Sequence, residues 1–181
     1  LGADVLAYNA NSGAKMLEQG ANAVVTDPDS ANFNGGNLRV SISFNRDPAH
    51  DKLSIANVGT STGQIGVSGT SVTFGGTPIG TFAGGTGTGD LVVTFNNAAT
   101  PVAVSALVNA IQFANDQASP ANTSRTVSFA LNDGQVGGQA APVAVNVNIA
   151  TGVTPSISIA NGFFIIENTQ LVTALSATDP N

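Results

Sequence analysis

The sequence predicts an all-β protein, an antiparallel β-sandwich with one short helix. Three observations support this prediction. Apolar and polar residues alternate in many short runs, glycine and asparagine turns separate these runs at even spacing, and the 42% hydrophobic content is enough for a core. Only 9% of the residues are charged, so hydroxyl and amide side chains must supply most of the polar surface.

The predicted strands follow one another along the first 150 residues. In the clearest run, 38–44, the apolar residues Leu38, Val40, Ile42 and Phe44 alternate with polar ones, as in a strand with one buried face. Further strand-like runs lie at 53–55, 65–67, 72–74, 79, 91–95, 127–131 and 143–149, and turn signals lie at 34–36, 75–76, 84–85 and 132–134. A parallel β-helix is the alternative fold, but no short repeat recurs to support it.

One segment has helical rather than strand-like spacing. Thr100 is a suitable N-cap, and Pro101 stands at the first helical position. Apolar residues then recur at intervals of three and four, at Val104, Leu107, Val108 and Ile111. This pattern predicts a short helix over 101–112 that closes one end of the sandwich.

The composition predicts a domain boundary near residue 150. We expect a first domain over 1–150, a linker over 151–155, and renewed strands in 156–181. The last segment is too short to bury a core alone, so it is predicted to begin a following domain. Leu1 is no initiator methionine and no leader-like segment follows it, which predicts that the chain is a piece of a longer protein.

The charge distribution argues against several kinds of partner. The net charge is −6, and the five basic residues are scattered, so we expect no binding to nucleic acid. An anionic membrane would repel the chain, and no apolar stretch approaches the roughly 20 residues that span a bilayer, so we expect no membrane insertion. The chain has no cysteine, which excludes disulfides and, for a secreted protein, favours a bacterial exterior.

Residues suited to catalysis are sparse. His50 is the only histidine, no Gly-x-Ser-x-Gly sequence is present, and the acidic residues lie mostly in turns. Asp47, His50 and Asp51 share a segment that we interpret as a solvated hairpin loop rather than a metal or acid–base site. The glycine-rich segment 84–90 is interpreted as a flexible hairpin, because its motif does not recur and a strand follows it. We therefore expect no enzymatic activity.

Asp27 and Asp29, which flank Pro28, are the first candidate metal ligands. Calcium is bound by several oxygen ligands, and two carboxylates in a loop at the end of a strand, completed by backbone oxygens, would suit it. The acidic net charge is compatible with a divalent cation. The alternative is a turn in which both aspartates cap backbone amides.

Several segments, all in one register, carry a resemblance to a known family. They begin with Asp27-Pro28-Asp29-Ser30 and run through 64–69, 79–82, 99–101, 111–115 and 125–129 to Asn132-Asp133-Gly134, so that the resemblance covers roughly residues 5–149. This pattern resembles the cadherin-like or chondroitin-sulfate-proteoglycan-like tandem repeats of giant secreted bacterial adhesins of the RTX type. Residues 156–181 look like the start of a following cadherin-like domain.

The resemblance implies tandem extracellular β-sandwiches of the immunoglobulin or cadherin type, with calcium at domain junctions. On this basis a second set of candidate calcium ligands is Glu167, Asp179 and Asn181, because Glu167 matches an acidic residue after the first strand and 177–181 matches a short acidic calcium motif. Two positions depart from the pattern. Ala10 stands where such repeats usually carry a glutamate, and the linker 151–155 lacks the Asn-Asp pair common at these junctions.

We therefore expect a structural or adhesive module at a bacterial cell surface or outside the cell, with roles in cell adhesion, biofilm or a surface layer. Its expected partners are neighbouring repeat domains of the same chain. One alternative is a subunit of a self-assembling surface layer or filament that uses open strand edges. Another is a glycan-binding module, for which the chain offers few aromatic platforms, with no tryptophan and one tyrosine, Tyr8.

Overall fold

The computed structural model describes residues 1–2, 4–151, 157–158 and 164–165. Strands make up 42% of the chain and the helix 6%, which confirms the predicted all-β class. The chain divides into two compact units, Leu1–Thr151 and Gly152–Asn181. In the second unit, β12 (Ile157–Ser158) pairs with β13 (Phe164–Ile165) in antiparallel fashion.

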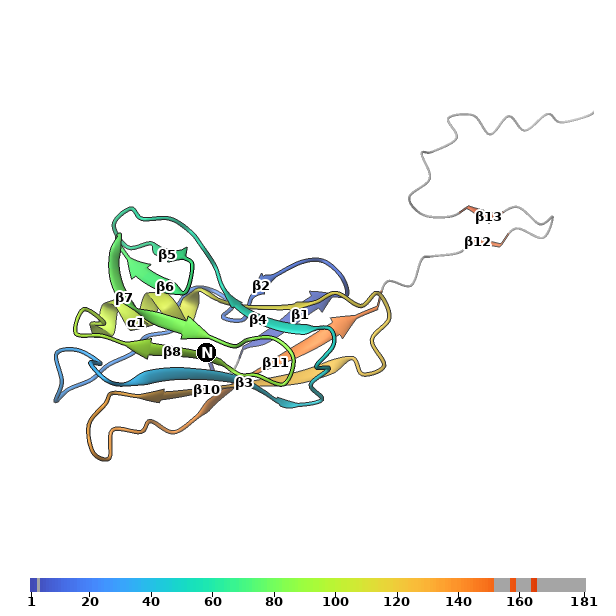
Figure 1. Cartoon of the computed structure of the whole chain (residues 1–181). Coiled ribbons are helices and arrows are strands. Elements are labelled where there is room, and N and C mark those ends of the chain that lie inside the picture. Colours follow the sequence, from blue (N-terminus) through green and yellow to red (C-terminus); the bar gives the residue numbers. More distant parts are fainter. Residues whose placement is uncertain (3, 152–156, 159–163, 166–181) are drawn as a thin grey trace, which may run out of the picture. The chain divides into compact units, whose positions relative to one another are not determined.

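The first unit contains two sheets and one helix (Figure 1). The larger sheet has eight strands in the spatial order β1-β11-β10-β3-β8-β7-β6-β5. In chain order these strands are β1 (Val5–Asn9), β3 (Asn37–Phe44), β5 (Ile65–Ser68), β6 (Ser71–Phe74), β7 (Thr77–Ala83), β8 (Leu91–Phe95), β10 (Ser124–Asn132) and β11 (Val143–Ala150). The smaller sheet has the order β2-β9-β4 and consists of β2 (Lys15–Met16), β9 (Ile111–Asn115) and β4 (Asp51–Ile55).

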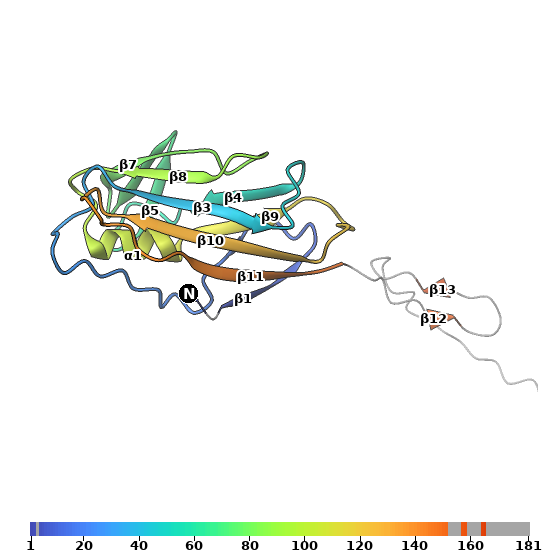
Figure 2. The same cartoon turned by 90° about the horizontal axis from the view of Figure 1, so that it is seen from below.

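The core lies between the inner face of the larger sheet and a second layer formed by the smaller sheet and α1 (Pro101–Asn109) (Figure 2). Alternate residues of the long strands face inward and are buried, among them Leu38 and Val40 of β3, Val127 of β10 and Val147 of β11. The rings of Tyr8 and Phe113 meet edge to face at 5.2 Å and join β1 of one sheet to β9 of the other. The alternation that predicted the strands is therefore the alternation between core and solvent.

Every strand-like run predicted between 38 and 149 lies in a strand of the structure. The segment 84–90 connects the antiparallel neighbours β7 and β8, which confirms the predicted hairpin. Three strands were not predicted from alternation: β1, β2 and β9. β1 exposes every second residue, and β2 has only two residues. β9 begins just after the end of the helix.

The predicted helix is present but ends earlier than expected. The Thr100 hydroxyl accepts a hydrogen bond from the Ala103 N–H (3.3 Å), which confirms the predicted N-cap. The helix ends at Asn109 rather than at 112, because Ile111 opens β9 and pairs with Ile55 of β4. Ile111 is buried at the start of β9, and an inward-facing position in a helix would also favour an apolar residue, so its apolar character alone could not locate the boundary.

The first and last strands of the unit, β1 and β11, are parallel neighbours, which departs from the predicted purely antiparallel arrangement. Val5 lies opposite Asn146 and Asn9 lies opposite Ala150. All other strand pairs of the unit are antiparallel. The chain thus enters this ladder at one end and leaves it at the other. In the described part of the chain, no helix has the length and apolar character to cross a membrane.

Candidate metal centre

Asp27 and Asp29 lie in the long connection between β2 and β3, in a stretch without helix or strand. The Oδ1 atom of Asp27 accepts a hydrogen bond from the Ser30 N–H (3.1 Å), so this carboxylate caps a local turn. Its second oxygen, Oδ2, is buried and has no hydrogen-bond partner among the described residues. Asp29, two residues on, is exposed. One of the two predicted aspartates therefore caps an amide and also has an unsatisfied buried oxygen.

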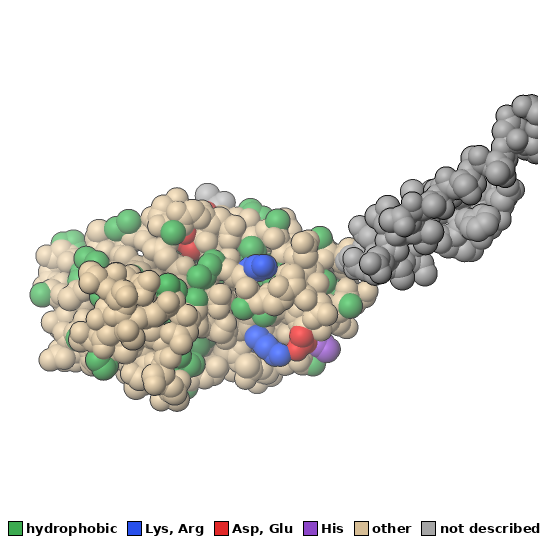
Figure 3. All heavy atoms as spheres, turned by 90° about the horizontal axis from the view of Figure 1, so that it is seen from above, with side chains coloured by type: hydrophobic (Ala, Val, Ile, Leu, Met, Phe, Trp, Pro, Cys, Tyr) green, Lys and Arg blue, Asp and Glu red, His purple; other side chains and the backbone are tan. Residues whose placement is uncertain are grey.

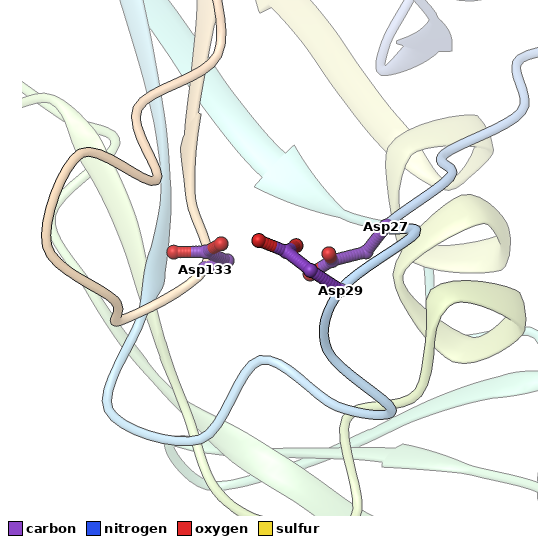
Figure 4. Close-up of side chains that lie close together, drawn as sticks. All are labelled: Asp27, Asp29 and Asp133. Atoms are coloured by element: carbon purple, nitrogen blue, oxygen red, sulfur yellow. The ribbon is translucent and has the colours of Figure 1, made fainter.

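A third carboxylate, that of Asp133, approaches this pair from a different part of the chain. Asp133 immediately follows β10 and is 8% exposed. Its Oδ1 atom accepts a hydrogen bond from the Gln135 N–H (2.7 Å), which fixes the side chain within the turn. Figure 4 shows the three side chains directed towards one another from the two loops. The carboxylate oxygens that face each other all lie within 4.8 Å.

Tight backbone contacts hold the two loops together and position Asp133. A Cβ atom at Gly36 would overlap the Asn132 carbonyl, and one at Gly134 would overlap the Asn34 carbonyl. Gly134 also has a φ of +90°, which side chains rarely adopt. A Cβ at Gly138 would overlap the carboxylate of Asp133 itself. The glycines at these three positions therefore allow the acidic turn to pack against the loop that precedes β3.

The chemistry of the cluster suits a hard divalent cation. Two ligands on opposite sides of a calcium ion are about 5 Å apart, so oxygens as close as these can all reach one ion, which loop carbonyls and water would complete. Three carboxylates this close repel one another unless a cation or a proton intervenes. The buried and unsatisfied oxygen of Asp27 is the second sign that a positive partner belongs here.

The outcome for the predicted site is mixed. Asp27 and Asp29 are brought together as expected, but their third partner, Asp133, was recognised in the sequence only as part of an Asn-Asp-Gly turn. The available signal for Asp133 was its position directly after a strand, because the loops at one end of a sandwich lie close together. The second predicted set, Glu167, Asp179 and Asn181, lies outside the described residues.

A different carboxylate, Asp51, corrects the prediction of a solvated loop. Asp51 opens β4 and is only 3% exposed. Its Oδ2 accepts from Arg125 Nε (2.6 Å) and from the Asp47 N–H (2.7 Å), and its Oδ1 accepts from Asn115 Nδ2 (2.7 Å). The Arg125 side chain is 1% exposed and also donates to two backbone carbonyls. This ion pair joins β10 of the larger sheet to β4 of the smaller one.

Two further acidic side chains, Asp116 and Asp90, are paired with basic ones. Asp116 accepts from Lys52 Nζ (2.6 Å) and lies 2.7 Å from His50 Nδ1, at the surface. Hydrogen bonding to Lys52, and then to His50, lowers the pKa of Asp116 from its usual value of 3.8. Asp90, at the end of the glycine-rich hairpin, is bonded to Arg39 and Arg46. Figure 3 shows how few charged side chains one face of the unit carries.

The fold defines the chain as an all-β sandwich, and the acidic cluster of Asp27, Asp29 and Asp133 is its candidate site. Comparisons of the chain with protein-family models, with curated proteins and with solved structures found no match. The resemblance to bacterial adhesin repeats therefore stays a prediction.

Proposed function

We propose that this chain is a structural module of a large extracellular or surface-attached bacterial adhesin, where it carries tension between neighbouring modules and has no catalytic role. The observation that carries this proposal is the parallel pairing of the first and last strands, β1 and β11. The predicted domain order, with a further domain after residue 155, and the resemblance to tandem adhesin repeats support it as well.

The parallel pairing determines how the module responds to a pull. Force applied at the two ends of the first unit acts along β1 in one direction and along β11 in the other. The ladder from Val5 opposite Asn146 to Asn9 opposite Ala150 is then loaded in shear, and its hydrogen bonds must break together rather than one by one. A terminal strand in antiparallel contact with its neighbour could instead be peeled away bond by bond.

The sandwich behind this ladder resists the same force. Tyr8 of β1 is 1% exposed, and its hydroxyl accepts a hydrogen bond from the Asn115 N–H (3.0 Å) of the smaller sheet. β11 pairs along most of its length with β10, which carries the buried Arg125. Moving β1 or β11 along its axis therefore disturbs the core and the contact between the sheets as well as the ladder.

Calcium is the second part of the proposal. An ion bound by Asp27, Asp29 and Asp133 would join the connection before β3 to the loop after β10, and would neutralise their mutual repulsion. Because the ion binds the folded state, it would raise the stability of the module as its concentration rises above the dissociation constant, with a logarithmic dependence on concentration. A module outside the cell meets calcium at concentrations where weak sites are occupied.

The experiment is the stretching of a tandem fusion of this unit in a force spectrometer. Asn148 of β11 faces solvent, and the ladder register directs its N–H towards β1, so Asn148→Pro should lower the unfolding force. The matched control is Ala7→Pro, which is also exposed but whose N–H points away from β11. We expect one force peak per module, lowered by Asn148→Pro and retained in Ala7→Pro. A chain that extends without peaks would contradict the role in carrying tension.

A further inference from the structure

The two outer edges of the eight-stranded sheet differ in how they are protected. At the β5 edge, the preceding segment covers the strand: the N–H groups of Val58 and Gly59 donate to the Ile65 carbonyl (2.8 and 3.1 Å). The Asn57 side chain also accepts from the Val67 N–H (3.1 Å). At the β1 edge, no described residue forms such a cover. Uncovered strand edges are templates for pairing with another chain.

The register of β1 shows which of its backbone groups are open. The Asn146 N–H donates to the Asp4 carbonyl (3.3 Å), and the Ala10 N–H donates to the Ala150 carbonyl (2.9 Å). In a parallel ladder with this phase, residues 4, 6, 8 and 10 bond to β11. The N–H and C=O groups of Val5, Ala7 and Asn9 therefore point away from the sheet. Apart from the Asn9 carbonyl, which accepts from the Ser12 N–H (3.1 Å), they have no hydrogen-bond partner among the described residues.

A groove of about 380 Å³ lies beside this open edge. Its walls come from β1 and from the segment that passes through β2 to Gly20. Glu18 lines the groove and is only 3% exposed. Its Oε2 accepts from the Asn22 N–H (3.1 Å), whereas its Oε1 is buried and lacks a donor in the part of the chain that the structure describes. The single chain thus leaves both backbone and side-chain groups unsatisfied along one edge.

We propose that the open edge of β1 pairs with the same edge of a second copy of this chain, in antiparallel fashion, about a two-fold axis at Ala7. In this register Ala7 lies opposite Ala7 of the partner subunit, and Val5 lies opposite Asn9 of the partner subunit. All three residues direct both backbone groups to the edge, and the Asn9 carbonyl has a second lone pair beside the one that accepts from the Ser12 N–H, so each opposed pair can exchange two hydrogen bonds. The edge is its own complement, as a two-fold interface requires.

Side chains and charges along the β1 edge suit pairing with a second copy of the chain. Ala7 is exposed, and its small side chain allows close approach at the axis. β1 has an acidic end at Asp4, whose Oδ2 accepts from the Gln19 N–H (3.2 Å) and lies 3.6 Å from the Leu1 amino group, and a basic end at Lys15, which lines the groove and follows β1 by a short loop. An antiparallel two-fold places the basic end of one copy beside the acidic end of the other, which favours this pairing.

The pairing adds a contact between molecules to the tension-bearing role, and it does not depend on that role. It makes one continuous sheet across two copies, in which the two chains run in opposite directions. Molecules that project from two facing surfaces meet in this orientation. Because a two-fold interface closes on itself, the product is a dimer rather than a filament.

Sedimentation equilibrium of the full chain from micromolar to millimolar concentration tests the proposal. We expect the mass to rise from 18.0 kDa towards twice that value. Ala7→Pro removes an N–H at the axis, and Ala7→Lys places two like charges opposite each other, so both should stay monomeric at concentrations at least tenfold higher. The matched control is Thr94→Lys, at an exposed position of β8 within the same sheet, which should dimerise like the parent chain.

Two results would overturn the proposal. One is a parent chain that is monomeric at every concentration, and the other is a dimer that persists in both Ala7 variants, which would place the contact on another surface. Should Ala7→Pro fail to fold, Ala7→Lys and the charge reversal Lys15→Glu still test the proposed interface, since both positions are exposed. The register has its own test, because the chain has no cysteine: Ala7→Cys should form a disulfide-linked dimer, and Thr94→Cys should not.

Discussion

Two groups of carboxylates lie at opposite ends of β10, and they differ in where their positive charge comes from. At the start of the strand, Asp51 is held by Arg125, and both of its oxygens accept hydrogen bonds. Just after the end of the strand, Asp133 meets Asp27 and Asp29, and the described residues supply no cation there. The first group is complete within the chain. The second has an excess of negative charge and a buried oxygen of Asp27 without a partner.

The difference shows how a chain with so few charges uses them. A buried ion pair links two sheets only if both partners are present, because removing one leaves a charge in a medium of low polarity. An acidic cluster can instead take its cation from solution, and a calcium ion bound there would make the stability of the module depend on calcium. We expect changes to the first group to act in all conditions and changes to the second to act through calcium.

The largest effect is expected for Arg125→Met. It removes the guanidinium and leaves the Asp51 carboxylate buried without its ion pair. The free energy of unfolding should fall by about 3–5 kcal/mol, as measured by urea denaturation. The control is the double variant Arg125→Met with Asp51→Asn, which removes both charges and should recover part of the loss. A loss below about 1 kcal/mol for the single variant would show that the pair contributes no more than a surface pair.

The next effect is expected for Asp133→Asn and depends on calcium. The amide oxygen can still accept from the Gln135 N–H, while one negative charge leaves the cluster. In a chelator, the variant should be as stable as the parent chain or more stable, because repulsion falls. In calcium at about 100 times its dissociation constant, it should lack the roughly 2.7 kcal/mol that binding gives the parent chain. Equal calcium responses in the two proteins would remove Asp133 from the site.

A similar loss of calcium response is expected for Gly138→Ala, which alters no ligand. The new Cβ would overlap the Asp133 carboxylate and force it to move. Overpacking of this kind costs about 1–3 kcal/mol. Isothermal titration should show weaker calcium binding, and Gly137→Ala is a control whose Cβ meets no atom within 4 Å, although its φ of +86° adds strain of its own. Unchanged binding in Gly138→Ala would contradict the placement of Asp133.

The smallest effect is expected at the surface group formed by Asp116, Lys52 and His50. The pKa of Asp116 is lowered by Lys52 and His50. Its contribution to stability is therefore full above pH 3.8, the usual value, and is lost as the pH falls through the lowered pKa. In Asp116→Asn, the melting temperature should depend less on pH in this range and should change little at neutral pH. A large loss of stability at pH 7 would show that these ion pairs stabilise the protein more than their exposure suggests.

Much of the fold could be predicted because the same alternation that identifies a strand also buries one of its faces. This held for most of β3, β10 and β11, but Phe44 at the end of β3 and Val143 at the start of β11 belong to the predicted alternation and are 56% and 37% exposed. It failed for β9, where Ile111 fits both the end of a helix and the start of a strand. Parallel pairing of β1 with β11 joins residues more than 140 positions apart (5 and 146), and local patterns carry no information on such contacts.

The candidate site was predictable in part for the same reason. Asp27 and Asp29 are close in sequence, and their spacing alone suggested a shared ion. Asp133 is brought to them only by the packing of two loops through Gly36 and Gly134. The sequence pattern places Asp51 in a solvated loop, because its partner, Arg125, lies 74 positions away. Contacts of this kind follow from the topology, which the sequence pattern does not reveal.

The most direct test of the account is a thermal melt of the full chain in millimolar calcium and again in excess chelator, beside the same pair of melts for Asp133→Asn. If the acidic cluster takes its cation from solution, the parent chain should melt about 5 °C or more higher in calcium, since each kcal/mol shifts a domain of this size by roughly 2–4 °C. The variant should show little or no shift. Identical melting of the parent chain in both solutions would mean that the three aspartates are turn-capping residues and that no calcium site exists in this module.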